Sequence, residues 1–173
     1  STGTGLTFLG MQGATSPSQH FQFRLVGNNH LQYLIRNSSN VVEYIEQPTS
    51  ISANEWTHVA LVKNSGTYQL YINGQLVNTK TFSGAITASL SELLIGAYAE
   101  GNNPKDLFFN GEIDEVRLWS VARTYDEIKC NMHRSIATAS NLEASFSFSE
   151  GSGNTSMNTS TGTVGTFYNG GTF

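Results

Sequence analysis

The residues from Trp56 to Lys80 decide the fold, since they contain WTHVALVK at 56–63, TYQLYI at 67–72 and QLVNTK at 75–80. Apolar and polar side chains alternate in these segments with period two, which is typical of half-buried β-strands. Asn73-Gly74 separates the last two segments. Because Asn and Gly tolerate positive φ, an Asn-Gly pair between alternating segments is the strongest short-range signal of a hairpin. The stretch therefore predicts three strands, the last two joined by a tight turn.

Segments on both sides of this stretch carry the same period. Phe21–Leu25 and Leu31–Arg36 flank the turn residues Gly27-Asn28-Asn29, which predicts a second hairpin. Val41–Glu46 reads as another strand that ends at Pro48, because proline cannot donate to a strand ladder. We expect three further strands at Leu93–Tyr98, Glu112–Trp119 and Leu142–Phe148.

One segment departs from the strand pattern. Thr124–Asn131 begins with a capping threonine and places Asp126 and Glu127 in the first turn, where acidic side chains complement the helix dipole. The sequence therefore predicts one short helix near residues 124–131. Many short strands with a lone helix indicate an all-β fold, a two-sheet antiparallel sandwich or jelly roll. No proline-rich linker divides the chain, so residues 1–173 are expected to form a single domain.

The interior of this sandwich is expected to hold alternating apolar residues from most of the strands. These are Phe21, Phe23, Leu25, Val59, Leu61, Leu70, Ile72, Val116, Leu118, Phe146 and Phe148. The single cysteine, Cys130, excludes a disulfide within the chain and is expected to be a small buried residue of the helix.

Composition excludes several classes of function. The chain has 173 residues with 9 Lys and Arg against 13 Asp and Glu, a formal net charge of −4. A mildly acidic chain without a basic cluster cannot replace the counterions of a phosphate backbone, so we expect no nucleic-acid binding. No apolar run approaches the ~20 residues of a membrane span, so we expect no membrane insertion. No targeting peptide is visible at the start of the sequence.

Three stretches carry a resemblance to a known family. They are WTHVA at 56–60, LYING at 70–74 and FNGEIDEVRLW at 109–119, in that order. They are similar to the signature strands of laminin-G-like, concanavalin A-like jelly-roll modules of the bacterial extracellular type. The resemblance spans roughly residues 50–150. It implies two stacked antiparallel sheets, an exported protein located outside the cell or on its surface, and a role in glycan binding or adhesion.

Two features depart from the pattern of the family. Its members usually open with a Phe-Asp-Gly-type strand and a strand with a Trp-Val-Lys-like ending, and neither stands before Leu6. Residues 142–173, with Glu150-Gly151-Ser152-Gly153-Asn154, resemble the lead-in of a following repeat. We therefore expect the opening strands to come from another segment. An unpaired sheet edge can act as a docking device, so neighbouring copies or adjacent modules are expected partners.

The acidic run Glu112-Ile113-Asp114-Glu115 is the candidate for catalysis or metal binding. Laminarinase-type hydrolases of the same fold carry similar acidic strands, but retaining chemistry needs a second carboxylate about 5 Å from the first. That position falls on Val116 or Arg117, so we expect no enzyme activity. The resemblance implies a structural calcium at Asp114, with Glu112 as the second ligand, although the usual partner in an opening Asp-Gly motif is absent here.

Glycan binding requires an aromatic platform with nearby polar groups. The loop that follows the strand at 93–98 offers Tyr98 with Asn102, Asn103 and Asp106 as one such rim. Tyr33 and Tyr44 are further aromatic residues expected on a sheet surface.

The sequence supports two functional hypotheses. The first is a non-catalytic extracellular module that recognises a glycan or cell-surface polysaccharide, or that mediates adhesion. The alternative is a structural repeat unit of a surface filament or multi-module array, completed by strand exchange with a neighbour.

Overall fold

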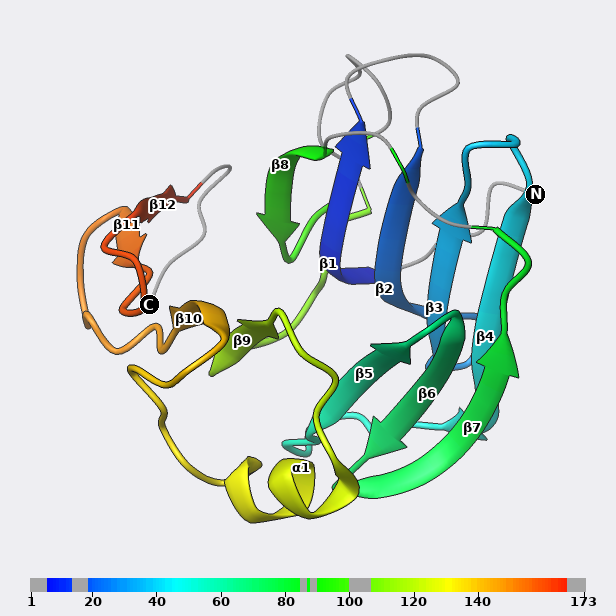
Figure 1. Ribbon diagram of the computed structural model, residues 1–173. Helices are drawn as coiled ribbons and strands as arrows, with labels where there is room; N and C mark the ends of the chain where they lie inside the picture. The colour runs from blue at the N-terminus through cyan, green and yellow to red at the C-terminus, as the bar shows by residue number, and fades with distance from the viewer. Residues whose placement is uncertain (1–5, 14–18, 85–86, 88–89, 100–106, 168–173) are drawn as a thin grey trace. The chain divides into compact units, whose positions relative to one another are not determined.

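The computed structural model describes residues 6–13, 19–84, 87, 90–99 and 107–167. The chain forms two compact units, Ser1–Gly111 and Glu112–Phe173, and each is described by itself (Figure 1). A single domain over residues 1–173 stays a prediction. No helix within the described ranges is long and apolar enough to cross a membrane.

Unit 1 contains two antiparallel sheets. The five-stranded sheet has the order β4-β3-β2-β1-β8 and consists of β1 Leu6–Gly13, β2 His20–Val26, β3 His30–Arg36, β4 Val42–Ser50 and β8 Leu90–Ile95. The three-stranded sheet has the order β5-β6-β7 and consists of β5 Val59–Asn64, β6 Thr67–Ile72 and β7 Gln75–Thr81. Side chains of both sheets join one hydrophobic cluster. The prediction of an all-β, antiparallel two-sheet sandwich is therefore confirmed.

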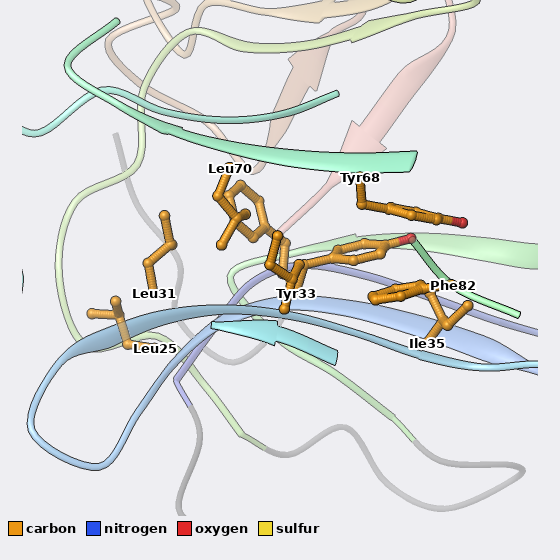
Figure 2. Packing of buried hydrophobic residues seen from close by; sticks show 9 residues of the cluster. Leu25, Leu31, Tyr33, Ile35, Tyr68, Leu70 and Phe82 are labelled. Carbon is orange, nitrogen blue, oxygen red and sulfur yellow. The ribbon is translucent and has the colours of Figure 1, made fainter. Parts of the chain in front are cut away.

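The core of unit 1 lies between these sheets (Figure 2). Leu31, Ile35 and Leu70 are fully buried, with 0% of their surface exposed. Tyr33 of β3 stacks on Tyr68 of β6 with ring centroids 5.5 Å apart, so aromatic rings join the two sheets. The expectation that Tyr33 lies on a sheet surface is wrong, since 7% of it is exposed and burial raises the pKa of its hydroxyl, with Tyr68 adding to the shift.

Most of the predicted core residues of unit 1 are confirmed. Phe23, Leu25 and Leu70 are buried in the cluster. Four others pack against it while partly buried: Phe21, Val59, Leu61 and Ile72. Alternation in β2, β5 and β6 therefore gave the correct inward face.

Both predicted hairpins of unit 1 are confirmed. Asn73 and Gly74 have φ of 48° and 72° and connect β6 to β7, as the positive φ of an Asn-Gly turn requires. Gly27 and Asn29 have φ of 52° and 62° and connect β2 to β3. The turn residues thus fix the register of β2–β3 and β6–β7.

The strands of unit 1 differ from expectation in several places, and β8 lies at Leu90–Ile95 instead of Leu93–Tyr98. β1 is an additional strand that the alternation does not predict, because a register shift between Thr7 and Leu9 interrupts it. β4 continues through Pro48, which lies in a bulge of this edge strand and is not required to donate to the ladder. β5 begins only at Val59, and Trp56 precedes it with 68% of its surface exposed.

Residues of β7 and of the segment after it form hydrogen bonds with the outer edge of β4. Asn78 Nδ2 donates to the carbonyl oxygen of Glu46 at 2.7 Å, and Lys80 Nζ donates to that of Tyr44 at 2.8 Å. Next along the edge, Glu43 accepts hydrogen bonds from the backbone N–H groups of Ser83 and Gly84 at 2.9 and 3.1 Å. The bond from Ser83 is the largest cause of a lowered Glu43 pKa. Two edge carbonyls of β4 and the Glu43 carboxylate are therefore hydrogen-bonded from within unit 1.

Unit 2 carries the helix and two small sheets. Its elements are β9 Val116–Trp119, α1 Tyr125–Asn131, β10 Leu142–Phe146, β11 Thr155–Met157 and β12 Val164–Thr166. β9 pairs with β10, and β11 pairs with β12, both antiparallel. Phe146 is buried, as expected, whereas Val116, Leu118 and Phe148 are partly buried.

The predicted helix of unit 2 is confirmed. The Thr124 side chain accepts the N–H of Glu127, and the Glu127 carboxylate accepts the N–H of Thr124, which together make a capping box. The expectation for Cys130 is wrong, because this thiol is exposed. Ile128 is the buried residue of the helix, so Cys130 lies outside its apolar stripe.

Candidate functional site

A row of polar side chains crosses the five-stranded sheet on the side opposite the core. Phe23 and Leu25 of β2 face the core, so Arg24 between them faces the other side. The register pairs Arg24 with Gln32 of β3 and Gln32 with Glu46 of β4. Three polar residues, 8 and 14 positions apart in sequence, thus lie side by side on adjacent strands.

Hydrogen bonds join this row into one network. Arg24 Nε and Nη2 donate to Gln32 Oε1 at 3.0 and 2.8 Å, and Arg24 Nη1 donates to Gln22 Oε1 at 2.9 Å. Gln32 Nε2 donates to Glu46 Oε2 at 2.7 Å. His30 Nδ1 lies 3.1 Å from Glu46 Oε1. We call Gln22, Arg24, His30, Gln32 and Glu46 the polar face.

The residues of the polar face differ in how far they are buried. Gln22 and Gln32 are only 5% and 7% exposed, whereas the side chains of His30 and Glu46 are 27% and 28% exposed. Burial lowers the pKa of Arg24, while the nearby Tyr98 and Glu46 act in the opposite direction. The guanidinium stays charged, since its ordinary pKa lies far above neutral pH. The polar face therefore presents donors and acceptors that the buried amides of Gln22 and Gln32 hold in place.

Tyr44 places an aromatic ring beside the polar face. It lies two residues before Glu46 on β4, so both point to the same side of the sheet. The register pairs Tyr44 with Leu34, and 49% of Tyr44 is exposed. Lys80 Nζ lies 5.1 Å from the centroid of its ring. An exposed aromatic ring next to hydrogen-bonding groups is the arrangement that a sugar ring requires.

Tyr98 lies over β1 on the same side of the sheet. Its ring packs over Gly10, where an added Cβ would come within 3.0 Å of Tyr98 Cδ2, and its centroid lies 5.4 Å from that of His20. With 3% of its surface exposed, Tyr98 packs within unit 1 and offers no open ring face there. Asn102, Asn103 and Asp106, the other residues predicted for this rim, lie outside the described residues.

The acidic segment of unit 2 does not form the strand that the sequence predicts. β9 begins at Val116, and Glu115 has a φ of +51°, a left-handed conformation that interrupts an extended strand. Glu112 and Asp114 are exposed, and Asp114 Oδ1 accepts the N–H of Glu115 at 2.8 Å. The alternation that placed Glu112 and Asp114 on one face of a strand therefore does not apply to them.

The polar face was not predicted from the sequence. The alternation of β2 and β3 predicts which side of each strand faces the core. The same pattern leaves Gln22, Arg24 and Gln32 on the opposite side. The long hydrogen-bonding side chains at these alternate positions are the feature of the sequence that indicates a polar side of the sheet. The cross-strand neighbours that make them one network follow only from the register.

A curated protein is similar in sequence to part of this chain. Pappalysin-1 of Mus musculus is 32% identical over 96 residues, which are 53% of this chain and only 6% of that protein. The chain thus spans a small part of the length of this curated relative.

Two solved structures share the fold. A protein of Bacteroides ovatus described as carbohydrate-binding has a TM-score of 0.69 at 21% identity, over 93% of this chain and 46% of that chain. The Ruminococcus gnavus IT-sialidase CBM40 has a TM-score of 0.62 at 18% identity, over 72% of each chain. Residues 2–129 match the family described as the concanavalin A-like lectin/glucanases superfamily. The chain therefore belongs to the concanavalin A-like lectin/glucanases superfamily.

Proposed function

We propose that this chain is a non-catalytic module that binds a glycan outside the cell or on its surface. The observation that carries the proposal is the polar face with the exposed ring of Tyr44 next to it. The fold adds support, since one of the similar structures is described as a carbohydrate-binding protein and another is the CBM40 of a sialidase. Membership in the superfamily is in agreement with the expectation from sequence.

The proposed contacts follow from the chemistry of sugars. The apolar face of a pyranose stacks on an aromatic ring, and its hydroxyls exchange hydrogen bonds with fixed polar groups. Tyr44 supplies the ring, Arg24 supplies donors, and Glu46 supplies acceptors. Because the buried glutamines hold Arg24 and Glu46 in place, little side-chain entropy is lost on binding.

A hydrolytic function is not supported by the carboxylates of this face. Glycoside hydrolases place two carboxyl groups about 5–9.5 Å apart. Glu46 lies on β4, whereas Glu92, which shares its side of the sheet by register, lies on β8 four strands away. Four strand spacings correspond to about 19 Å. The described residues of this face therefore do not form a hydrolytic pair.

Mutation of the polar face tests the proposal. Purified protein is screened on a glycan array, and the best ligand is titrated by calorimetry. We expect Arg24→Ala and Tyr44→Ala to weaken binding roughly 10-fold or more, since each removes a contact worth about 1.4 kcal/mol.

The chain offers matched controls for both variants. Arg134 is an exposed arginine of unit 2, and Tyr125 is an exposed tyrosine that also carries a lysine over its ring, Lys129 Nζ at 5.6 Å. Arg134→Ala and Tyr125→Ala are expected to leave binding unchanged. A protein that binds no glycan, or loses binding equally in all four variants, contradicts the proposal.

Calcium binding by Asp114 and Glu112 stays a prediction. Within the described ranges, no three His, Cys, Asp or Glu side chains are placed to hold a metal ion. The six to eight oxygens that calcium takes would have to be completed by backbone or water oxygens. If the site forms, we expect excess calcium to raise the Tm by several degrees over that in EDTA.

A pair of variants checks this expectation. Asp114→Asn is expected to abolish the difference in Tm, whereas Glu143→Gln, at an exposed carboxylate of β10, is expected to keep it. The same Tm with calcium and with EDTA in the unmutated protein rejects a stabilising calcium ion.

A further inference from the structure

We infer that Gln32 is the positioning residue of the polar face and that it selects sugar hydroxyls over sugar carboxylates. The inference rests on the proposed glycan-binding function. Gln32 is 7% exposed, so a ligand meets the groups that it holds rather than Gln32 itself. Its amide makes three hydrogen bonds, two to Arg24 and one to Glu46.

The orientation of the Gln32 amide is fixed by its two neighbours. A guanidinium can only donate hydrogen bonds, and an ionised carboxylate can only accept them. The amide oxygen must therefore face Arg24, and the amide nitrogen must face Glu46. One buried side chain thus holds the donor at one end of the row and the acceptor at the other end in a fixed arrangement.

This arrangement restricts what Arg24 can bind. Arginine recognises a carboxylate best through two parallel N–H groups that form a fork. The fork of Nε and Nη2 is closed by Gln32 Oε1, and Nη1 donates to Gln22. Of the five N–H groups of a guanidinium, two therefore remain, one on each terminal nitrogen. These can donate to sugar hydroxyl oxygens, whereas the side-on fork of Nε and Nη2, one of the two forks that a carboxylate can use, is already taken by Gln32.

The opposite end of the row disfavours an acidic sugar as well. The Glu46 carboxylate is separated from Arg24 by a single amide group, so a ligand carboxylate at Arg24 would be repelled by it. Two other cations near this face, among the described residues, donate to neutral oxygens: Arg36 to Asn40 Oδ1 at 2.9 Å and Lys80 to the Tyr44 carbonyl. A sugar hydroxyl both donates and accepts, so neighbouring hydroxyls suit both ends of the row.

The first test measures the class of ligand. The wild-type protein is titrated with lactose and with sialyllactose, and with neutral and uronate-containing oligosaccharides that bind on an array. We expect neutral sugars to bind at least 10-fold more tightly than the matched acidic ones. A preference for the acidic partner at this face overturns the inference and leaves the proposed function standing, whereas no binding of any glycan removes the proposed function itself.

The second test uses two substitutions at Gln32 that differ in one property. Gln32→Met keeps the length of the side chain and removes the amide, so we expect binding to fall at least 10-fold at every pH. Gln32→Glu keeps the oxygen that faces Arg24 but sets a carboxylate against that of Glu46 at neutral pH. Two carboxylates in contact share one proton, and the pKa of the pair rises above that of a free carboxyl.

The pH profile separates positioning from a general structural role. Binding by Gln32→Glu, relative to wild type at the same pH, is expected to be weak at pH 7.5 and to recover toward pH 5, since a shared proton restores the donor to Glu46. Division by the wild-type value removes the effects of pH that both proteins share. Recovery of Gln32→Met to the same extent, or its binding like wild type, overturns the inference.

A measurement without ligand keeps the inference testable if a variant is unstable. In the wild-type protein, the Nε–H of Arg24 donates to a buried oxygen, so its NMR signal is expected to exchange slowly with solvent. Gln32→Met is expected to broaden or lose this signal while Gln75→Met, at an exposed position of β7, keeps it. An unchanged signal in Gln32→Met contradicts the positioning role.

Discussion

Replacing Leu70 with alanine is expected to lower the free energy of unfolding of unit 1 by about 3–5 kcal/mol. Leu70 of β6 is 0% exposed and lies in the cluster that joins both sheets (Figure 2). Truncation removes apolar contacts and leaves a cavity, and the cost is largest where the surroundings cannot collapse. Stacked rings such as Tyr33 on Tyr68 restrict such collapse, since they already lie in contact across the sheets.

A neighbouring leucine provides the control for this prediction. Leu76 of β7 is 47% exposed, so Leu76→Ala is expected to change the free energy of unfolding by less than about 1 kcal/mol. Equilibrium urea unfolding, followed by circular dichroism, measures both variants. Similar midpoints for Leu70→Ala and Leu76→Ala would show that the space between the sheets is not a packed core.

Asn158→Ala is expected to destabilise unit 2 by about 3 kcal/mol, because it leaves buried backbone donors without partners. Asn158 is 4% exposed, and its Oδ1 accepts the N–H groups of Ser145 and Ser160 at 2.9 and 3.0 Å. Its Nδ2 donates to Thr161 Oγ1 at 2.8 Å. One side chain thereby ties β10 to the turn between β11 and β12.

Hydrogen exchange measures this effect locally. In Asn158→Ala, the amides of Ser145 and Ser160 are expected to exchange about 100-fold faster, the factor that corresponds to roughly 3 kcal/mol. Asn154→Ala, at an exposed asparagine of the same unit, is expected to leave both amides unchanged. Equal protection in Asn158→Ala and wild type would mean that these bonds contribute nothing to the stability of unit 2.

The sequence predicted those elements of the fold whose signal is local. Asn73-Gly74 determines its hairpin through positive φ, and Thr124 with Glu127 determines the start of α1 through a capping box. Neither feature depends on distant residues. The inward face of β2 and β6 followed in the same way from alternation of neighbouring side chains.

The errors arise where distant contacts override the local pattern. The sequence does not predict β1, because the alternation of this strand is broken at the register shift between Thr7 and Leu9. Pro48 is tolerated in β4 because it falls in a bulge, and the bulge depends on pairing with β3. Glu115 adopts a left-handed φ in a segment whose composition suggests a strand. Each of these requires knowledge of a partner strand or of tertiary context.

The candidate site was less predictable than the fold for the same reason. No motif in the sequence connects Arg24, Gln32 and Glu46. The register of three strands brings them together into one hydrogen-bonded network. The sequence favours Tyr98 as an aromatic platform, whereas the structure packs this residue over Gly10. Tyr44 is expected on a sheet surface and lies on the side of the polar face, but its polar neighbours follow only from the pairing of β3 with β4.

The bridged edge of β4 has a consequence for the protein in crowded conditions. Asn78 and Lys80 occupy the outward carbonyls of Glu46 and Tyr44, which are the groups that an incoming strand would use as its template. An incoming strand therefore has to displace these two hydrogen bonds before it can pair with β4, which disfavours edge-to-edge association of unit 1 through this strand.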